Sequence, residues 1–211
     1  MDTNKPHPVS LTVDYPEQPR DRASVFFRLI LVIPIAVLVA LLVGTSYHHG
    51  FDGAGRDTAW ATAGCVVAPT LLMLLFRRKY PRWWFDWNLN LNRFIFRVSA
   101  YFGLLRDEYP STDEEQAVHL DVAYPDAKTQ LNRWLPLVKW FLVIPHIVVL
   151  CFVDIAAYVC VIIAWFAILF TGRYPRALFD FVVGVMRWQA RVVWYAVLFA
   201  TDKYPPFSIE A

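Results

Sequence analysis

Long runs of apolar residues alternate with short polar stretches along this chain. Four runs stand out, at residues 26–44, 59–76, 137–153 and 155–170. Each has about 16 to 19 residues, close to the minimum that crosses a bilayer as a helix. The last two form one unbroken stretch, which would measure about 50 Å as a single helix and exceed a hydrocarbon core of about 30 Å. We therefore predict two transmembrane helical hairpins, the second turning near Asp154.

Basic residues cluster beside these runs. They are Arg20, Arg22, Arg28, Arg77, Arg78, Lys79, Arg82, Arg133, Lys139, Arg173 and Arg176. Because cytoplasmic segments of membrane proteins carry an excess of Lys and Arg, this pattern predicts a multi-pass protein of the bacterial plasma membrane with both termini in the cytoplasm. Only the turn at Asp154 and the loop at residues 45–58 are expected outside.

The chain repeats itself. Four segments of the first half recur in the same order in the second half. The first two are "VSLTVDYP" at residues 9–16, which matches "VHLDVAYP" at 118–125, and "LVIP", which occurs at 31–34 and 142–145. The other two are "KYPRWWFD" at 79–86, which matches "RYPRALFD" at 173–180, and "DEYP" at 107–110, which matches "DKYP" at 202–205. Such self-similarity predicts an internal duplication. We expect residues 1–113 and 114–211 to share one plan of strand, helical hairpin, amphipathic helix and strand. The strands, with alternating apolar positions, should pair with one another or with the "PPFSIE" tail in a small cytoplasmic sheet.

The two amphipathic helices, expected at residues 83–105 and 177–199, each carry one polar stripe. The stripes are Asp86, Asn90, Arg93 and Arg97, and Asp180, Gly184, Arg187 and Arg191. Spacings of four, three and four return to one helical face. Two arginines one turn apart would be expensive at the centre of a bilayer, so we expect these helices to lie in the interface.

The stripes have two possible roles. If they face each other, Asp86 meets Arg187 or Arg191, and Asp180 meets Arg93 or Arg97, as an ion-paired seam between the halves. Alternatively, their arginines bind an anionic phospholipid headgroup. The predicted fold class is thus an all-α membrane protein with a small β element, internally duplicated, with two transmembrane hairpins and two interfacial amphipathic helices.

Composition supports membrane association and argues against other classes. Hydrophobic residues make up 57% and aromatic residues 17% of the chain, which lies outside the range of soluble domains. A net charge of +2 argues against nucleic acid as a partner. His146 and Asp154 are ionisable residues inside apolar runs; we expect His146 to pack as a neutral side chain and Asp154 to cap the predicted turn. Phosphate loops, nucleophile elbows, HExxH and CxxC motifs are absent from the sequence, so we expect no enzyme, cofactor or metal site.

The order of YP, LVIPH, GRYPRALFDF, RW-x2-RV-x2-Y and TDKYPPFSI resembles the actinobacterial membrane-protein family known as domain of unknown function 4389. The resemblance implies a duplicated membrane module and supplies no mechanism. We expect a membrane protein without catalytic activity, an accessory or scaffold subunit that docks to a larger bacterial membrane complex. The alternative is a small transporter or lipid-handling protein with a headgroup site between the halves.

Overall fold

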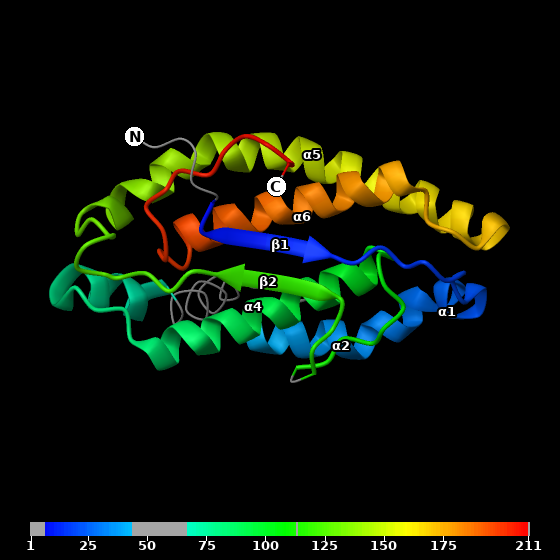
Figure 1. The fold of residues 1–211 in the computed structure, drawn as a ribbon, viewed down its shortest axis with the longest axis horizontal. Coiled ribbons are helices and arrows are strands. Elements are labelled where there is room, and N and C mark those ends of the chain that lie inside the picture. Colours follow the sequence, from blue (N-terminus) through cyan, green and yellow to red (C-terminus); the bar gives the residue numbers. More distant parts are fainter. Residues whose placement is uncertain (1–6, 44–66, 113, 211) are drawn as a thin grey trace, which may run out of the picture.

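The computed structural model describes residues 7–43, 67–112 and 114–210 and is mostly helical (Figure 1). Its elements follow in the order β1 (Val9–Val13), α1 (Arg22–Phe26), α2 (Arg28–Val43), the π-helical turn η2 (Met73–Arg77), α4 (Arg82–Phe102), β2 (Val118–Val122), α5 (Leu135–Thr171) and α6 (Arg176–Ala196). The η2 turn ends a helix that spans Val67–Arg77.

The two strands form a small antiparallel sheet in which Leu11 lies opposite Leu120. Their alternating sequences bury Val9, Leu11 and Val13 on one face and expose polar residues on the other. Two strands alone are marginally stable in water, and the buried face of this sheet packs on the helices beneath it. Of the two predicted pairings, the strands pair with one another, and the tail does not join the sheet. The closing strand predicted in each half is not formed, since residues 103–112 and 197–210 contain no strand.

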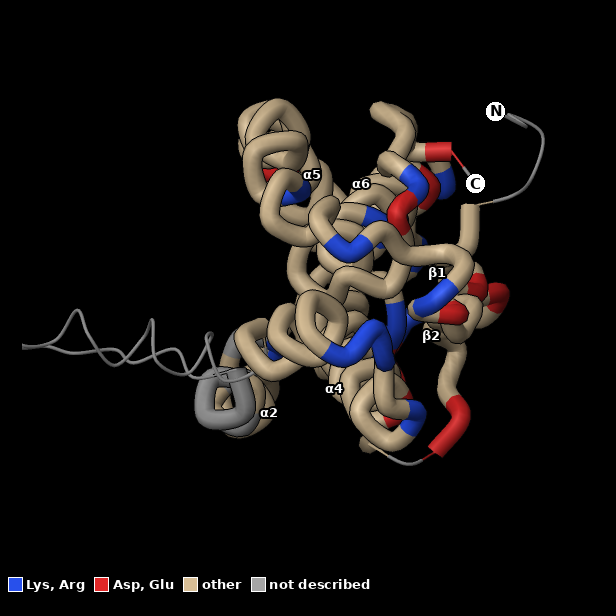
Figure 2. Tube along the Cα trace, turned by 90° about the vertical axis from the view of Figure 1, so that its left-hand side faces the viewer, with Lys and Arg blue, Asp and Glu red and all other residues tan. Residues whose placement is uncertain are grey.

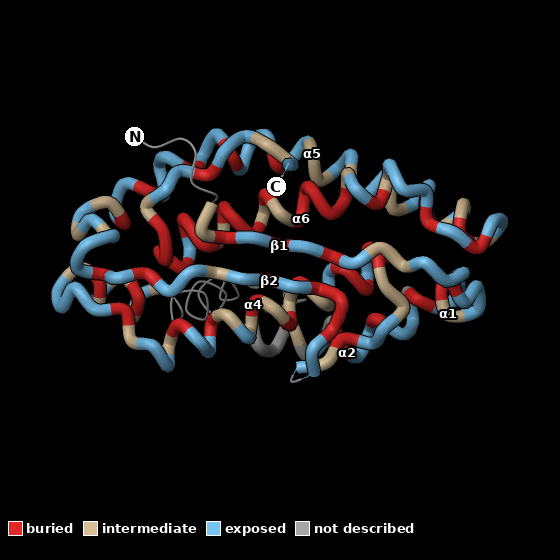
Figure 3. Tube along the Cα trace, viewed as in Figure 1, coloured by how far each residue is buried: buried red, intermediate tan, exposed pale blue. Residues whose placement is uncertain are grey.

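The molecule is layered, as the view along its length shows (Figure 2). The sheet covers one side of α4 and α6, while α2 and α5 lie on the other side. Helix α6 is buried over most of its length, whereas α5 is largely exposed (Figure 3). The main core therefore lies between the sheet and the paired helices, around residues such as Leu11, Leu120, Phe85, Phe179 and Trp194.

The predicted second hairpin is wrong, because α5 runs through Asp154 as one helix of 37 residues. The stretch between residues 137 and 170 has no glycine, and the helix continues through Pro145. Its inward residues Val143, Leu150 and Ile168 are buried, so the unbroken helix keeps one face on the protein. The helix ends at Gly172, the first glycine after the run, which takes a left-handed φ of 74° and donates to the Ile168 carbonyl.

The amphipathic helices are confirmed, with slightly earlier ends than predicted. Helices α4 and α6 stop before residues 104 and 199 because Leu104 and Phe199 have positive φ angles of 60° and 53°. For the first predicted hairpin, α1 and α2 cover residues 22–43, and the predicted loop at 45–58 lies outside the described residues. Within the described ranges, α5 is the one helix long and apolar enough to cross a membrane by length and composition.

Candidate functional site

The arginines of the two polar stripes fasten the sheet to the helices. Arg93 Nε of α4 donates to the Leu120 carbonyl oxygen of β2 at 3.0 Å. Arg187 Nε of α6 donates to the Leu11 carbonyl oxygen of β1, also at 3.0 Å. Hydrogen bonds from a charged donor are stronger than neutral ones, so these two contacts hold the strands in register over α4 and α6.

The second arginine of each stripe holds a neighbouring segment of chain. Arg97 Nη1 donates to the Ser111 carbonyl oxygen at 2.9 Å, and Arg191 Nη2 donates to that of Glu210 at 2.6 Å. The tail passes so close to α6 that a Cβ atom on Gly184 would lie 2.8 Å from Ile209. The glycine in the second stripe therefore makes room for the C-terminal tail. Burial, and next the charge of Arg187, lower the pKa of Arg191.

The predicted ion-paired seam is not formed. Asp86 and Asp180 are exposed, and in the described parts of the chain neither makes an ion pair with the arginines of the opposite helix. The physical reason is that these arginines turn toward the strands, the Ser111 segment and the tail, where they meet backbone carbonyl oxygens, and Arg93 also pairs with Asp121 of β2. Asn90, in the first stripe, is also exposed. A headgroup role for these arginines stays a prediction.

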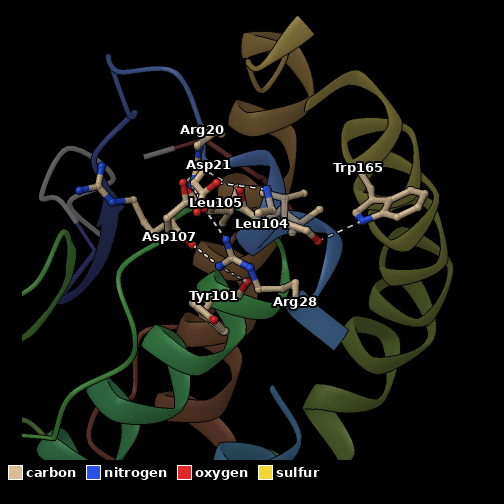
Figure 4. Close-up of polar contacts among 11 residues, drawn as sticks. Arg20, Asp21, Arg28, Tyr101, Leu104, Leu105, Asp107 and Trp165 are labelled. Atoms are coloured by element: carbon tan, nitrogen blue, oxygen red, sulfur yellow. Dashed lines mark hydrogen bonds and ion pairs between the residues drawn. The ribbon is translucent and has the colours of Figure 1, made fainter. Parts of the chain in front are cut away.

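Two buried arginines close the C-terminal end of α4 (Figure 4). Arg20 Nη1 lies 2.8 Å from Asp107 Oδ1, and Arg28 also pairs with Asp107. Arg20 donates to the carbonyl oxygens of Leu104, at 2.9 Å, and of Leu105, which the end of α4 leaves without helical partners. Burial lowers the pKa of Arg20, while the Asp107 carboxylate opposes that shift.

A corresponding cation closes the end of α6. Lys139 Nζ is fully buried, lies 2.7 Å from Asp202 Oδ1 and donates to the Thr201 carbonyl oxygen at 2.7 Å. It lies 4.8 Å from the centre of the Tyr195 ring, as Arg28 lies 4.0 Å from that of Tyr101. We did not predict any of these three ion pairs from the sequence, those of Arg20 and Arg28 with Asp107 and that of Lys139 with Asp202. The signal was present, since the aspartates open the matching "DEYP" and "DKYP" segments.

The remaining predicted site residues, His146 and Asp154, lie on the side of α5 that faces α6. His146 is fully buried, accepts a hydrogen bond from Trp188 Nε1 at 3.1 Å and stacks on Phe207 with ring centres 3.9 Å apart. Asp154 Oδ1 accepts from Gln189 Nε2 at 2.8 Å. Asp154 therefore links two helices and does not cap a turn.

The outward surface of α5 is apolar along its whole length. Phe141, Phe152 and Phe170 are 72%, 70% and 79% exposed. Further exposed apolar side chains of this helix include Ile144, Ile147, Ile155, Val159, Ile162 and Phe166. Since the polar side chains Lys139, His146 and Asp154 are directed inward, the outward surface is a continuous apolar face. Patches of this extent mark membrane or protein interaction sites.

In the part of the chain that the structure describes, these features define a mostly helical protein with a small two-stranded sheet and one helix that could cross a membrane by length and composition. Residues 134–208, which include α5, α6 and the C-terminal segment, match the model of the family described as Domain of unknown function (DUF4389). This match confirms the resemblance noted in the sequence over these residues. No curated protein and no solved structure matches the chain.

Proposed function

We propose that this chain is an integral membrane protein of the bacterial plasma membrane without catalytic activity, and that it serves as an accessory or scaffold subunit of a larger membrane complex. The observation that carries this proposal is the apolar outward face of α5. Water is a poor solvent for such a surface, at about 25 cal/mol per Å² of exposed apolar area, so lipid or protein covers it.

The chain lies in the plane of the bilayer surface. Helix α5 would be about 55 Å long at 1.5 Å per residue, nearly twice the hydrocarbon thickness. It runs along the same axis as α6 and the sheet (Figure 1). If α5 crossed the bilayer, the exposed strand residues Thr12, His119 and Asp121 would enter hydrocarbon with it, at a cost of several kcal/mol. In the plane, α5 and α2 face the acyl chains while the sheet faces water.

This orientation replaces the multi-pass topology that a second hairpin implied. It keeps both ends of the described chain on the sheet side, since His7 and Glu210 both lie beside Arg191. Figure 2 supports the same polarity, because the charged residues gather toward the sheet and leave α2 and α5 nearly free of charge. We assign the sheet side to the cytoplasm because the basic clusters flank the apolar runs.

The two halves are an internal duplication related by a pseudo-twofold axis through the Leu11–Leu120 pair. Supporting this, several contacts occur twice. The Tyr15 hydroxyl donates to the Tyr174 carbonyl oxygen, and that of Tyr124 donates to the Tyr80 carbonyl oxygen. The guanidinium of Arg176 lies over the Tyr15 ring and that of Arg82 over the Tyr124 ring. The arginine–strand contacts and the buried ion pairs are two further matched sets.

A tryptophan cluster at the start of α4 is the surface through which the partner docks. The ring centres of Trp83 and Trp84 are 5.5 Å apart and those of Trp84 and Trp87 are 5.2 Å apart. Trp83 is 69% exposed although it belongs to this packed cluster. Tryptophan is enriched among the residues that contribute most to protein interfaces. A lipid-handling role is the second candidate, and a basic cavity beside this cluster favours it.

Isolation of the tagged protein from native membranes in a gentle detergent, followed by intact-complex mass spectrometry, tests the docking proposal. We expect a defined heavier species at fixed stoichiometry. W83S/W87S should release that partner, while W134S, at an exposed tryptophan before α5, should retain it. Recovery of a lone chain from wild-type membranes, with or without bound phospholipid, would contradict the docking role.

A further inference from the structure

An open cavity of about 460 Å³ lies between the start of α4 and the turn after β2. Arg78, Lys79 and Arg82 line one wall, and Lys128 lines the other. The two walls are joined by the Tyr124 hydroxyl, which donates to the Tyr80 carbonyl oxygen. Two segments that are far apart in the sequence therefore form this cavity together.

The lining of this cavity has a strong excess of positive charge. Asp126 is the one carboxylate among the lining residues, against four cationic side chains. That carboxylate accepts its hydrogen bonds from within its own turn, from the Lys128 backbone N–H at 3.0 Å and from Thr129 Oγ1 at 2.8 Å. These bonds lower the pKa of Asp126. In the described residues, none of the four cations makes an ion pair with a carboxylate.

The start of α4 adds to the attraction for an anion. Helix α4 has 21 residues, and its N-cap Pro81 provides no side-chain hydrogen bond to the first turn. The free N–H groups and the helix dipole at this end favour negative charge. Arg82, at the first helical position, is held over the Tyr124 ring, with its guanidinium carbon 5.5 Å from the ring centre. Its donors are therefore positioned beside the cavity.

Exposed aromatic residues bracket the basic segment. Phe76 and Trp83 are both exposed, and they directly flank residues 77–82. Aromatic side chains next to Lys and Arg are typical of the level where phospholipid headgroups lie. Phosphate is the anion concentrated at that level.

We propose that this cavity binds a phosphate group, and that the phosphate is carried by the headgroup of an anionic phospholipid. The proposal rests on the proposed membrane location only for the lipid source of the phosphate. Arg78, Lys79 and Arg82 contact the phosphate from the α4 side. Lys128 contacts it from the turn after β2. The corresponding place before α6 has Gly172 where the first half has Arg78 and Pro19 where it has Lys128, so only one half carries the complete site.

Thermal unfolding of the delipidated full-length protein in a neutral detergent provides the test. The probes are dioleoyl-phosphatidylglycerol, dioleoyl-phosphatidylcholine and inorganic phosphate, with intact-protein mass spectrometry to count bound lipid. We expect phosphatidylglycerol to raise Tm and to stay bound where phosphatidylcholine does not. K79Q/R82Q should bind phosphatidylglycerol on the order of tenfold more weakly, since each basic residue near an anionic lipid contributes several-fold in affinity.

R173Q/R176Q is the matched control, because it removes the same charge at the corresponding place before α6 and should bind like wild type. K79R/R82K keeps the charge and should restore binding. A second outcome is that inorganic phosphate raises Tm, that K79Q/R82Q removes this rise, and that both lipids give equal responses. This outcome supports the phosphate site and assigns it to free phosphate. Equal phosphatidylglycerol binding by K79Q/R82Q and wild type would overturn the proposal. This result is independent of whether a heavier complex is recovered from membranes.

Discussion

Leu11 and Leu120 lie opposite each other at the centre of the sheet, and the carbonyl oxygen of each accepts a hydrogen bond of 3.0 Å from an arginine on a different helix. Each strand is therefore fastened to one helix and paired with the other strand. The link between the two halves runs through the backbone of these strands. The arginine stripes contribute to it by fixing each strand on its helix.

Loss of the arginine contact should destabilise the protein more than loss of the stripe aspartate. R187A removes the bonds to the Leu11 and Ile209 carbonyl oxygens, and hydrogen bonds from charged donors contribute about 1.5–3 kcal/mol each. D86N and D180N alter exposed side chains and should leave the Tm in detergent unchanged. Equal losses of Tm for R187A and D180N would revive the ion-paired seam.

Removal of the carboxylate beneath the buried cations should be among the most damaging single changes. D107N leaves both Arg20 and Arg28 buried without a counter-charge, and breaking a buried ion pair costs about 3–5 kcal/mol. D202N should weaken the end of α6 in the same way through Lys139. D14N, at an exposed aspartate, is the control. Denaturant unfolding in detergent measures the three variants, and wild-type stability in D107N would contradict this account.

Positions along α5 should all lie at one depth in a bilayer. Phe141, Phe152 and Ile163 are exposed and spaced by eleven residues, which returns close to the same helical face, and they span about 33 Å of helix. Single cysteines there, in a chain whose other cysteines are alanine, can carry a fluorophore for quenching by brominated lipids. We expect equal depths at the three positions. A position 152 much deeper than the other two would indicate that α5 crosses the bilayer.

Acid should destabilise the packing around His7. Burial of the ring, and next the positive charge of Arg191, lower the pKa of His7 to about 4, below the ordinary value of 6.5. The folded state therefore favours the neutral ring, and this contribution to stability is present above pH 6.5 and is lost as the pH falls toward 4. H7Q keeps an acceptor for the Val9 N–H and should remove that part of the pH dependence of Tm. H119Q, at an exposed histidine, should retain it.

Gly184 should tolerate a side chain only when the tail is removed. In the full chain, the new methyl group of G184A would meet Ile209 at 2.8 Å, and overpacking of this kind costs about 1–3 kcal/mol. In a chain lacking residues 208–211, the same substitution should cost nothing. N90A, at the exposed counterpart in α4, should be neutral in both backgrounds. Additive losses for G184A and the truncation would show that the tail does not lie on α6.

Several elements could be predicted because their signals are local. Helices α4 and α6 follow from apolar residues at helical spacing, and β1 and β2 follow from alternation bounded by Tyr-Pro pairs. The prediction of a turn at Asp154 is wrong because it takes the hydrocarbon thickness as the limit on helix length. That limit applies to a helix along the bilayer normal, whereas α5 buries residues of one face from Val143 to Ile168 and packs on α6 and α1.

Sequence alone determined the apolar character of the chain, its repeated segments and the residue types on each helical face. Only the tertiary structure decided which partners those residues meet. The spacing between Arg93 or Arg187 and the aspartate of its stripe is the same whether the arginine pairs across an axis or bonds to a strand. Every residue has a backbone carbonyl group, so the sequence does not show which of these groups an arginine will meet. The two aspartates that do neutralise buried cations, Asp107 and Asp202, lie beyond the helices, and chain folding brings them to Arg28 and Lys139.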